Sequence, residues 1–137
     1  MQVTFKLLDK EHKLNRSLQD SAVKLFEKLD RYVPEPTQLD LRAEHIHSTR
    51  KGKTHYVHVA VAVTKEPRTF HAEALAEDFR TAFDRLYKKT ERYLRKRHDK
   101  LIKKSRNAER KIRIRDWLSS TLSTPRRLLG RFRRRRE

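Results

Sequence analysis

Apolar residues alternate with polar ones along four short stretches of the chain, which is the pattern of strands with one buried face. The clearest stretch is residues 54–64, where Val57, Val59 and Val61 alternate with small or polar residues. A short turn at Pro67 follows it, so we expect an antiparallel hairpin with the next strand. The same alternation predicts the other three strands over residues 2–8, 37–47 and 68–75.

A first helix is predicted between the first two strands. Its apolar positions recur at helical spacing as Leu18, Ala22, Leu25 and Leu29. Asn15 or Ser17 can cap its start. We expect the helix to end near Tyr32, because Pro34 and Pro36 disfavour its continuation.

A second, longer helix is predicted from Glu77 and Asp78 onward, since acidic residues suit the positive N-terminal end of a helix. Its buried stripe should contain Phe79, Ala82, Phe83, Leu86, Thr90, Tyr93 and Leu94. The element order is then βαβββα, an α+β fold with one four-stranded sheet and two helices packed on one face. The strand–helix–strand crossover makes the first two strands candidates for parallel neighbours.

The basic charge is concentrated in the second half of the 137-residue chain, whose formal net charge is +18. Residues 1–79 carry 13 Lys/Arg against 12 Asp/Glu, a net charge of +1, whereas residues 80–137 carry 23 against 6, a net charge of +17. Such a block requires an anionic partner, either nucleic acid or an anionic membrane. We divide the chain into a domain over residues 1–104 and an arginine-rich tail over residues 105–137, expected to be poorly ordered alone and to fold on binding.

The sequence lacks the residue patterns needed for disulfides, metal binding and catalysis. The chain has no cysteine, which excludes disulfides and Cys-based zinc sites and fits a reducing interior. Its seven histidines lack any metal-binding spacing, so we expect no metal. With Gly52 and Gly130 as the only glycines, and no nucleophile–base pair, we predict no catalysis, no cofactor and no small-molecule substrate. No segment has the pattern of a secretory signal or a membrane span.

Long cationic side chains on the second helix, on the side away from its apolar stripe, are the expected ligands of RNA phosphates. They are Arg80, Arg85, Lys88, Lys89, Arg92, Arg95, Lys96, Arg97, Lys100 and Lys103. In the turn between the second and third strands, Arg50, Lys51 and Lys53 offer a second phosphate row, although an ordinary exposed turn explains them equally well. Expected ligands in the tail are Arg113, Arg115, Arg126, Arg127, Arg131, Arg133 and Arg134. Trp117 is a better candidate than Tyr93 for stacking on bases, since Tyr93 belongs to the apolar stripe.

Residues 70–84 resemble the signature of the ribosome hibernation promoting factor family, which includes the ribosome-associated inhibitor and the sigma-54 modulation proteins. The family pattern is a strand ending in His-Ala-x-Ala, then Asp-x-x-x-Ala-apolar-Asp, then a Lys/Arg-rich helix. The matching residues are His71, Ala72, Ala74, Asp78, Ala82, Phe83 and Asp84. The βαβββα order agrees with the family over residues 1 to about 104.

The resemblance implies a mechanism. Family members lie between the head and body of the small ribosomal subunit, bind its rRNA, compete with mRNA and tRNA, and so inhibit translation by idle ribosomes. It also implies a cytoplasmic, ribosome-associated protein, which we expect to be monomeric, and a structural role for His71. Long members carry a strand-rich dimerisation domain, for which this tail is too short. The resemblance therefore supports ribosome silencing by this chain more than it supports ribosome dimerisation.

Two alternatives stay open. A general double-stranded-RNA-binding module also packs two helices on one sheet face, but its α-β-β-β-α order lacks the strand at residues 2–8. A peripheral membrane protein is the other alternative, in which the tail lies on anionic lipid. Apolar residues among the arginines allow this arrangement, namely Trp117, Leu118, Leu128, Leu129 and Phe132. We rank a membrane below RNA as the partner.

Overall fold

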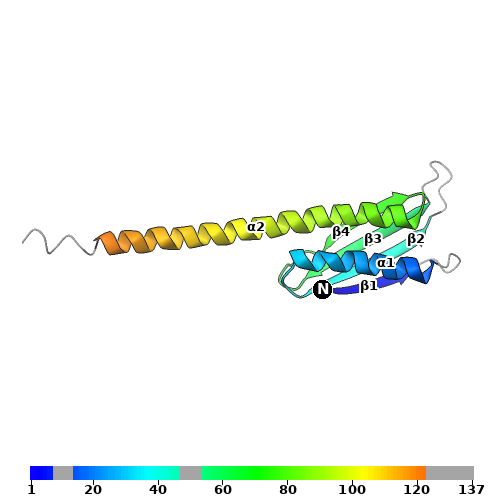
Figure 1. Ribbon diagram of the computed structural model, residues 1–137, viewed down its shortest axis with the longest axis horizontal. Coiled ribbons are helices and arrows are strands. Elements are labelled where there is room, and N and C mark those ends of the chain that lie inside the picture. The colour runs from blue at the N-terminus through cyan, green and yellow to red at the C-terminus, as the bar shows by residue number, and fades with distance from the viewer. Residues whose placement is uncertain (8–13, 47–53, 123–137) are drawn as a thin grey trace, which may run out of the picture. The chain divides into compact units, whose positions relative to one another are not determined.

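The computed structural model describes residues 1–7, 14–46 and 54–122, and its elements follow the predicted βαβββα order (Figure 1). The strands are β1 (Gln2–Leu7), β2 (Thr37–His45), β3 (His55–Val63) and β4 (Phe70–Ala76). The helices are α1 (Arg16–Glu27), a 3-10 helix η1 (Lys28–Tyr32) and α2 (Phe79–Leu122). The predicted α+β fold class is confirmed.

The four strands form one sheet in the order β1-β2-β3-β4. β1 pairs with β2 in parallel, with Val3 opposite Leu39, as the crossover predicted. The β2–β3 and β3–β4 pairs are antiparallel, which confirms the predicted hairpin. Both helices cover the same face of the sheet, α2 with its first part (Figure 1).

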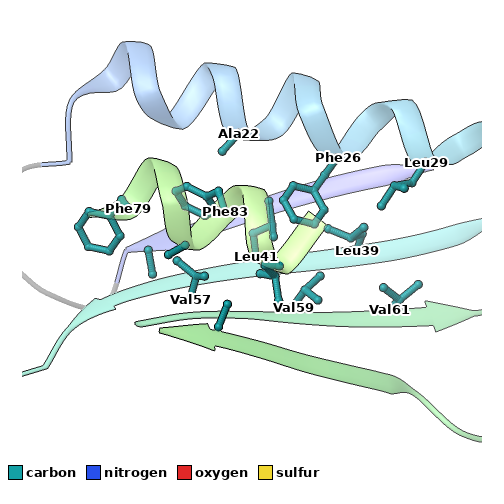
Figure 2. Close-up of a cluster of buried hydrophobic side chains, with 14 of the residues drawn as sticks. Ala22, Phe26, Leu29, Leu39, Leu41, Val57, Val59, Val61, Phe79 and Phe83 are labelled. Atoms are coloured by element: carbon teal, nitrogen blue, oxygen red, sulfur yellow. The ribbon is translucent and has the colours of Figure 1, made fainter. Parts of the chain in front are cut away.

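The hydrophobic core lies between the sheet and the two helices (Figure 2). The largest side chains that are fully buried are Phe26, Leu29, Leu39, Leu41, Leu86, Leu94, Val57, Val59 and Val61. They come from alternate positions of β2 and β3 and from one side of each helix, because these periodicities place side chains on a single face. Tyr93 departs from the predicted stripe: it is 37% exposed, and its ring stacks on Phe70 at a centroid distance of 3.8 Å.

Side-chain caps fix the start of each helix. The Asn15 side chain accepts a hydrogen bond from the Ser17 N–H at 3.1 Å, so Asn15 rather than Ser17 caps α1. The Asp78 carboxylate accepts one from the Thr81 N–H at 2.6 Å, and this bond lowers the pKa of Asp78. α1 ends at Glu27, earlier than expected, and η1 continues the chain to Tyr32, where the prolines stop it.

The helix α2 continues across the predicted boundary at residue 104, as far as Leu122. Contacts divide the chain into two compact units, residues 1–98 and 99–137. Residues 105–122 are therefore helical in the chain itself, which differs from a tail that folds on binding. The sequence between residues 79 and 122 contains neither glycine nor proline, so nothing interrupts the helix. The functional division into residues 1–104 and 105–137 stays a prediction.

Candidate nucleic-acid interface

The exposed side of α2 is mostly cationic in its part in the first unit, where Asp84 is also exposed. Its exposed cations there are Arg80, Arg85, Lys88, Lys89, Arg92, Arg95 and Lys96. From Arg85 onward they recur at spacings of three and four residues, which places them on neighbouring positions of one helix side. The buried residues Leu86, Thr90 and Leu94 lie on the other side. One helix thus packs on the sheet and presents a row of positive charges.

Two of these cations form hydrogen bonds with the edge strand of the sheet. β4 is an edge strand, and two of its carbonyl oxygens accept hydrogen bonds from α2. Arg85 Nη1 donates to the Leu75 carbonyl at 3.1 Å, and Lys89 Nζ donates to the Glu73 carbonyl at 2.7 Å. Cations that cover an edge strand discourage pairing with another strand. A groove of about 390 Å³ follows this edge and is lined by Ala74, Leu75, Arg85, Lys88, Lys89 and Arg92.

Four cations of the same helix face make no hydrogen bond or ion pair with any other residue that the structure describes. They are Lys88, Arg92, Arg95 and Lys96. An anion can therefore bind these charges without breaking a contact among residues 1–7, 14–46 and 54–122. A guanidinium can bind a phosphate bidentately, while an ammonium supplies a mobile point charge.

Arg97 was predicted to bind RNA together with this group, but its side chain is engaged in contacts within the fold. Its side chain is 11% exposed and forms ion pairs with Glu66 and Glu35, the latter at 3.3 Å. Burial alone lowers the pKa of Arg97, but the hydrogen bonds to Glu66 and Glu35 outweigh it and raise the pKa. Helical spacing places Arg97 on the buried side of α2, three residues after Leu94 and seven after Thr90. Two carboxylates next to the ends of neighbouring strands, Glu35 and Glu66, reach it there. We therefore remove Arg97 from the candidate interface.

Sequence reasoning missed two cations at the other helix. A groove of about 630 Å³ runs between α1 and α2, and Lys24 and Lys28 line it together with Arg80. Leu18, Leu25 and Phe83 supply apolar surface to the same groove. Lys24 and Lys28 are four residues apart, a spacing that places both on one side of a helix. That spacing could have identified the two lysines in the sequence. The nearly neutral net charge of residues 1–79 drew attention away from them.

Four of the seven histidines lie in two pairs on the sheet. His58 and His71 stack at 5.3 Å, and burial, His71 and Arg42 lower the pKa of His58. His45 and His55 meet edge to face at 4.9 Å, beside Phe79. Within residues 1–7, 14–46 and 54–122, no group of three or more His, Asp or Glu side chains can hold a metal ion.

The remaining predicted ligands divide into two groups. Lys100, Lys103, Arg113 and Arg115 lie on α2 within residues 99–122 and are exposed. Outside the described residues lie Arg50, Lys51, Lys53, Arg126, Arg127, Arg131, Arg133 and Arg134. No helix of the described chain is both long enough and apolar enough to span a bilayer.

The strand order and the two helices on one face define a small α+β domain of βαβββα topology. A family model described as sigma 54 modulation protein / S30EA ribosomal protein matches residues 5–102. The chain belongs to this family, the one to which the signature at residues 70–84 pointed. It is a family of ribosome-associated proteins, a non-enzymatic kind.

A solved structure supports the fold. The N-terminal domain of Protein Y from Thermus thermophilus has 18% sequence identity and a TM-score of 0.55, covering 70% of this chain and 98% of that domain. A ribosomal subunit interface protein from Coxiella burnetii has 20% identity and a TM-score of 0.49, covering 70% of this chain and 96% of its own. No curated protein sequence matches the chain significantly. The family match ends at Ile102 and leaves residues 103–137 outside it.

Proposed function

We propose that the protein binds the rRNA of the small ribosomal subunit in the channel used by mRNA and tRNA, and thereby inhibits translation in idle ribosomes. The observation that carries this proposal is the cationic side of α2, which lies within the part of the chain that matches the ribosome-associated family. The protein is then cytoplasmic and bound to ribosomes as a monomer. It acts by occupying space and has no catalytic step.

The unpaired cations of α2 are the proposed phosphate ligands. Lys88, Arg92 and Lys96 follow one another at intervals of four residues, about 6 Å along the helix axis. Such a row can track consecutive phosphates, because each long side chain adjusts its reach. Burial of the opposite helix side against the sheet holds the row in a fixed orientation. Preorganised charges lose less conformational entropy on binding.

The groove between α1 and α2 adds further positive charge, beside the carboxylate of Asp84 that also lines it. Lys24 and Lys28 line one side of it, and Arg80 lies across on α2. A strand of RNA bound along the helix layer would then contact both helices. Arg50, Lys51 and Lys53 remain predicted RNA ligands, as proposed from the sequence.

Competition with tRNA and mRNA on isolated small subunits tests whether the protein binds in their channel. Labelled protein is bound to subunits, and either tRNA with a short mRNA or an antibiotic that binds outside the channel is added. We expect tRNA and mRNA to displace the protein and the unrelated antibiotic to leave it bound. In a cell-free extract, the protein should reduce translation in proportion to the fraction of subunits that it occupies. Simultaneous binding of protein, mRNA and tRNA would contradict the proposed site.

A further inference from the structure

The last turns of α2 carry an exposed apolar face that the ribosome-binding proposal does not use. Ile114, Trp117, Leu118 and Leu122 are 60%, 64%, 47% and 77% exposed. Their spacings of three, four and eight residues place them on one side of the helix. Asp116, Ser119 and Ser120 lie on the opposite side, so this part of the helix is amphipathic.

This face belongs to the second compact unit of the chain, residues 99–137. Every side chain from Asp99 to Leu122 is exposed. The family match ends at Ile102, so the family fold does not account for these residues. Single exposed apolar residues need no explanation, but four that share one helix side, including a tryptophan, indicate a binding surface.

The charge around the face restricts what can cover it. Residues 105–137 carry twelve Lys/Arg against three Asp/Glu, a net charge of +9. A second copy would bring an equal positive charge against the first, which disfavours self-association through this segment. RNA would neutralise the arginines but would leave most of the aliphatic surface in water, since phosphates and sugars are polar. The partner should therefore be anionic and should also offer an apolar interior.

An anionic lipid surface has both properties. Amphipathic helices with Trp and Leu on one side and cations around them lie in the headgroup region, with the apolar side towards the acyl chains. Clustered Arg and Lys strengthen this binding where the lipid is anionic. The sequence beyond α2 continues the same composition, with Leu128, Leu129 and Phe132 among the arginines of residues 126–136.

We propose that residues 114–122 anchor the protein to anionic membrane surfaces through this apolar face and the cations beside it. The charge of the tail alone favours RNA as its ligand, and the exposed apolar side of the helix reverses that order. This anchor lies on the last turns of α2, whereas the proposed ribosome-binding surface lies on α1 and on the earlier part of α2. Neither depends on the other.

Trp117 is the only tryptophan of the chain and lies on the proposed face, so its fluorescence reports binding directly. The full-length protein is mixed with vesicles of phosphatidylcholine alone or of phosphatidylcholine with phosphatidylglycerol. We expect a blue shift and protection from acrylamide with the anionic vesicles, together with co-sedimentation. Neutral vesicles should have little effect.

Two matched double variants test whether vesicle binding depends on this apolar face or on exposed apolar residues in general. Leu118→Ser with Leu122→Ser removes two residues of the face and should weaken vesicle binding about tenfold or more. Leu101→Ser with Ile112→Ser removes one leucine and one isoleucine, also exposed, from the other side of the helix. This control pair should change vesicle binding less than about twofold. Both double variants should retain helix content by circular dichroism and should still co-sediment with ribosomes.

Three results would overturn the anchor. The first is a shift of Trp117 fluorescence with purified rRNA but not with anionic vesicles, which would return the tail to RNA binding. The second is equal binding to neutral and anionic vesicles, and the third is binding to neither. Ribosome binding is measured in parallel, so a failure of the anchor is distinguished from a failure of the ribosome proposal.

Discussion

Arg95 and Arg97 lie two positions apart on α2 and have different roles. Arg95 is exposed and makes no ion pair within the described structure, whereas Arg97 is held by Glu35 and Glu66. Charge counting cannot distinguish them, because the difference depends on where two distant carboxylates lie in the fold. Sequence reasoning therefore found the cationic helix but did not anticipate the ion pairs of Arg97 with Glu35 and Glu66.

Arg97→Gln should destabilise the domain without weakening ribosome binding by the folded protein. The substitution leaves Glu35 and Glu66 without their cation, at a cost of about 1–3 kcal/mol. The side chains of Glu35 and Glu66 are 22% and 34% exposed, so the effect should lie towards the lower end. Urea denaturation gives the stability, and co-sedimentation below the transition gives the binding. Unchanged stability with lost ribosome binding would make Arg97 an RNA ligand after all.

The His58–His71 pair predicts a dependence of stability on pH. Burial, with His71 and Arg42 nearby, lowers the pKa of His58 below the ordinary value of 6.5. The unfolded chain then binds a proton more readily, so the protein should lose stability as pH falls below about 6.5. His58→Gln should reduce this loss in thermal melts between pH 7.5 and 5. An identical pH dependence in the wild type and the variant would exclude His58 as its source.

Among the elements, the strands were the most predictable and the long helix the least. The alternation around Val57, Val59 and Val61 predicted β3 to within one residue at each end. Its strength comes from burial of one face, which also sets the register. The helix across residues 105–122 was underestimated, because its apolar residues find no core in the chain, and the basic composition resembles that of disordered segments. The groove between α1 and α2 depends on tertiary packing, which no local pattern contains.

The contact between α2 and β4 predicts that two of the helix cations protect the sheet edge. Arg85→Gln with Lys89→Gln should expose the carbonyls of Glu73 and Leu75 and increase self-association through the edge strand. Lys88→Gln with Arg92→Gln is the matched control, because it removes equal charge from the same groove without a backbone contact. Light scattering during incubation at moderate temperature should rise for the first pair only. Equal scattering from both pairs would show that net charge, and not edge protection, controls association.

On the scale of the whole molecule, the fold and the tail should be separable. Every side chain of residues 99–122 is exposed, and the last fully buried residue in the described part of the chain is Leu94. A protein ending at Lys104 should therefore keep the melting temperature of the full chain. It should also bind ribosomes at the same place, because the proposed RNA ligands of α2 up to Lys103 are retained. A large loss of thermal stability on truncation would show that the tail packs on the domain.

The central claim is that free cations on α2 bind ribosomal RNA, and a charge-matched comparison tests it most directly. Lys88→Gln with Arg92→Gln and Lys96→Gln removes three unpaired charges from the helix face. Lys6→Gln with Lys65→Gln and Arg68→Gln removes three exposed charges elsewhere and leaves the same net charge.

Both triple variants and the wild type are sedimented with purified ribosomes at a series of salt concentrations. With roughly six to ten phosphate contacts, wild-type affinity should fall by about three to five orders of magnitude between 50 and 200 mM salt. The helix variant should bind more weakly and lose about three units of the salt slope, roughly 0.9 for each phosphate contact. The control variant should resemble the wild type. Equal weakening of the two variants, or wild-type binding by the helix variant, would contradict the proposed interface.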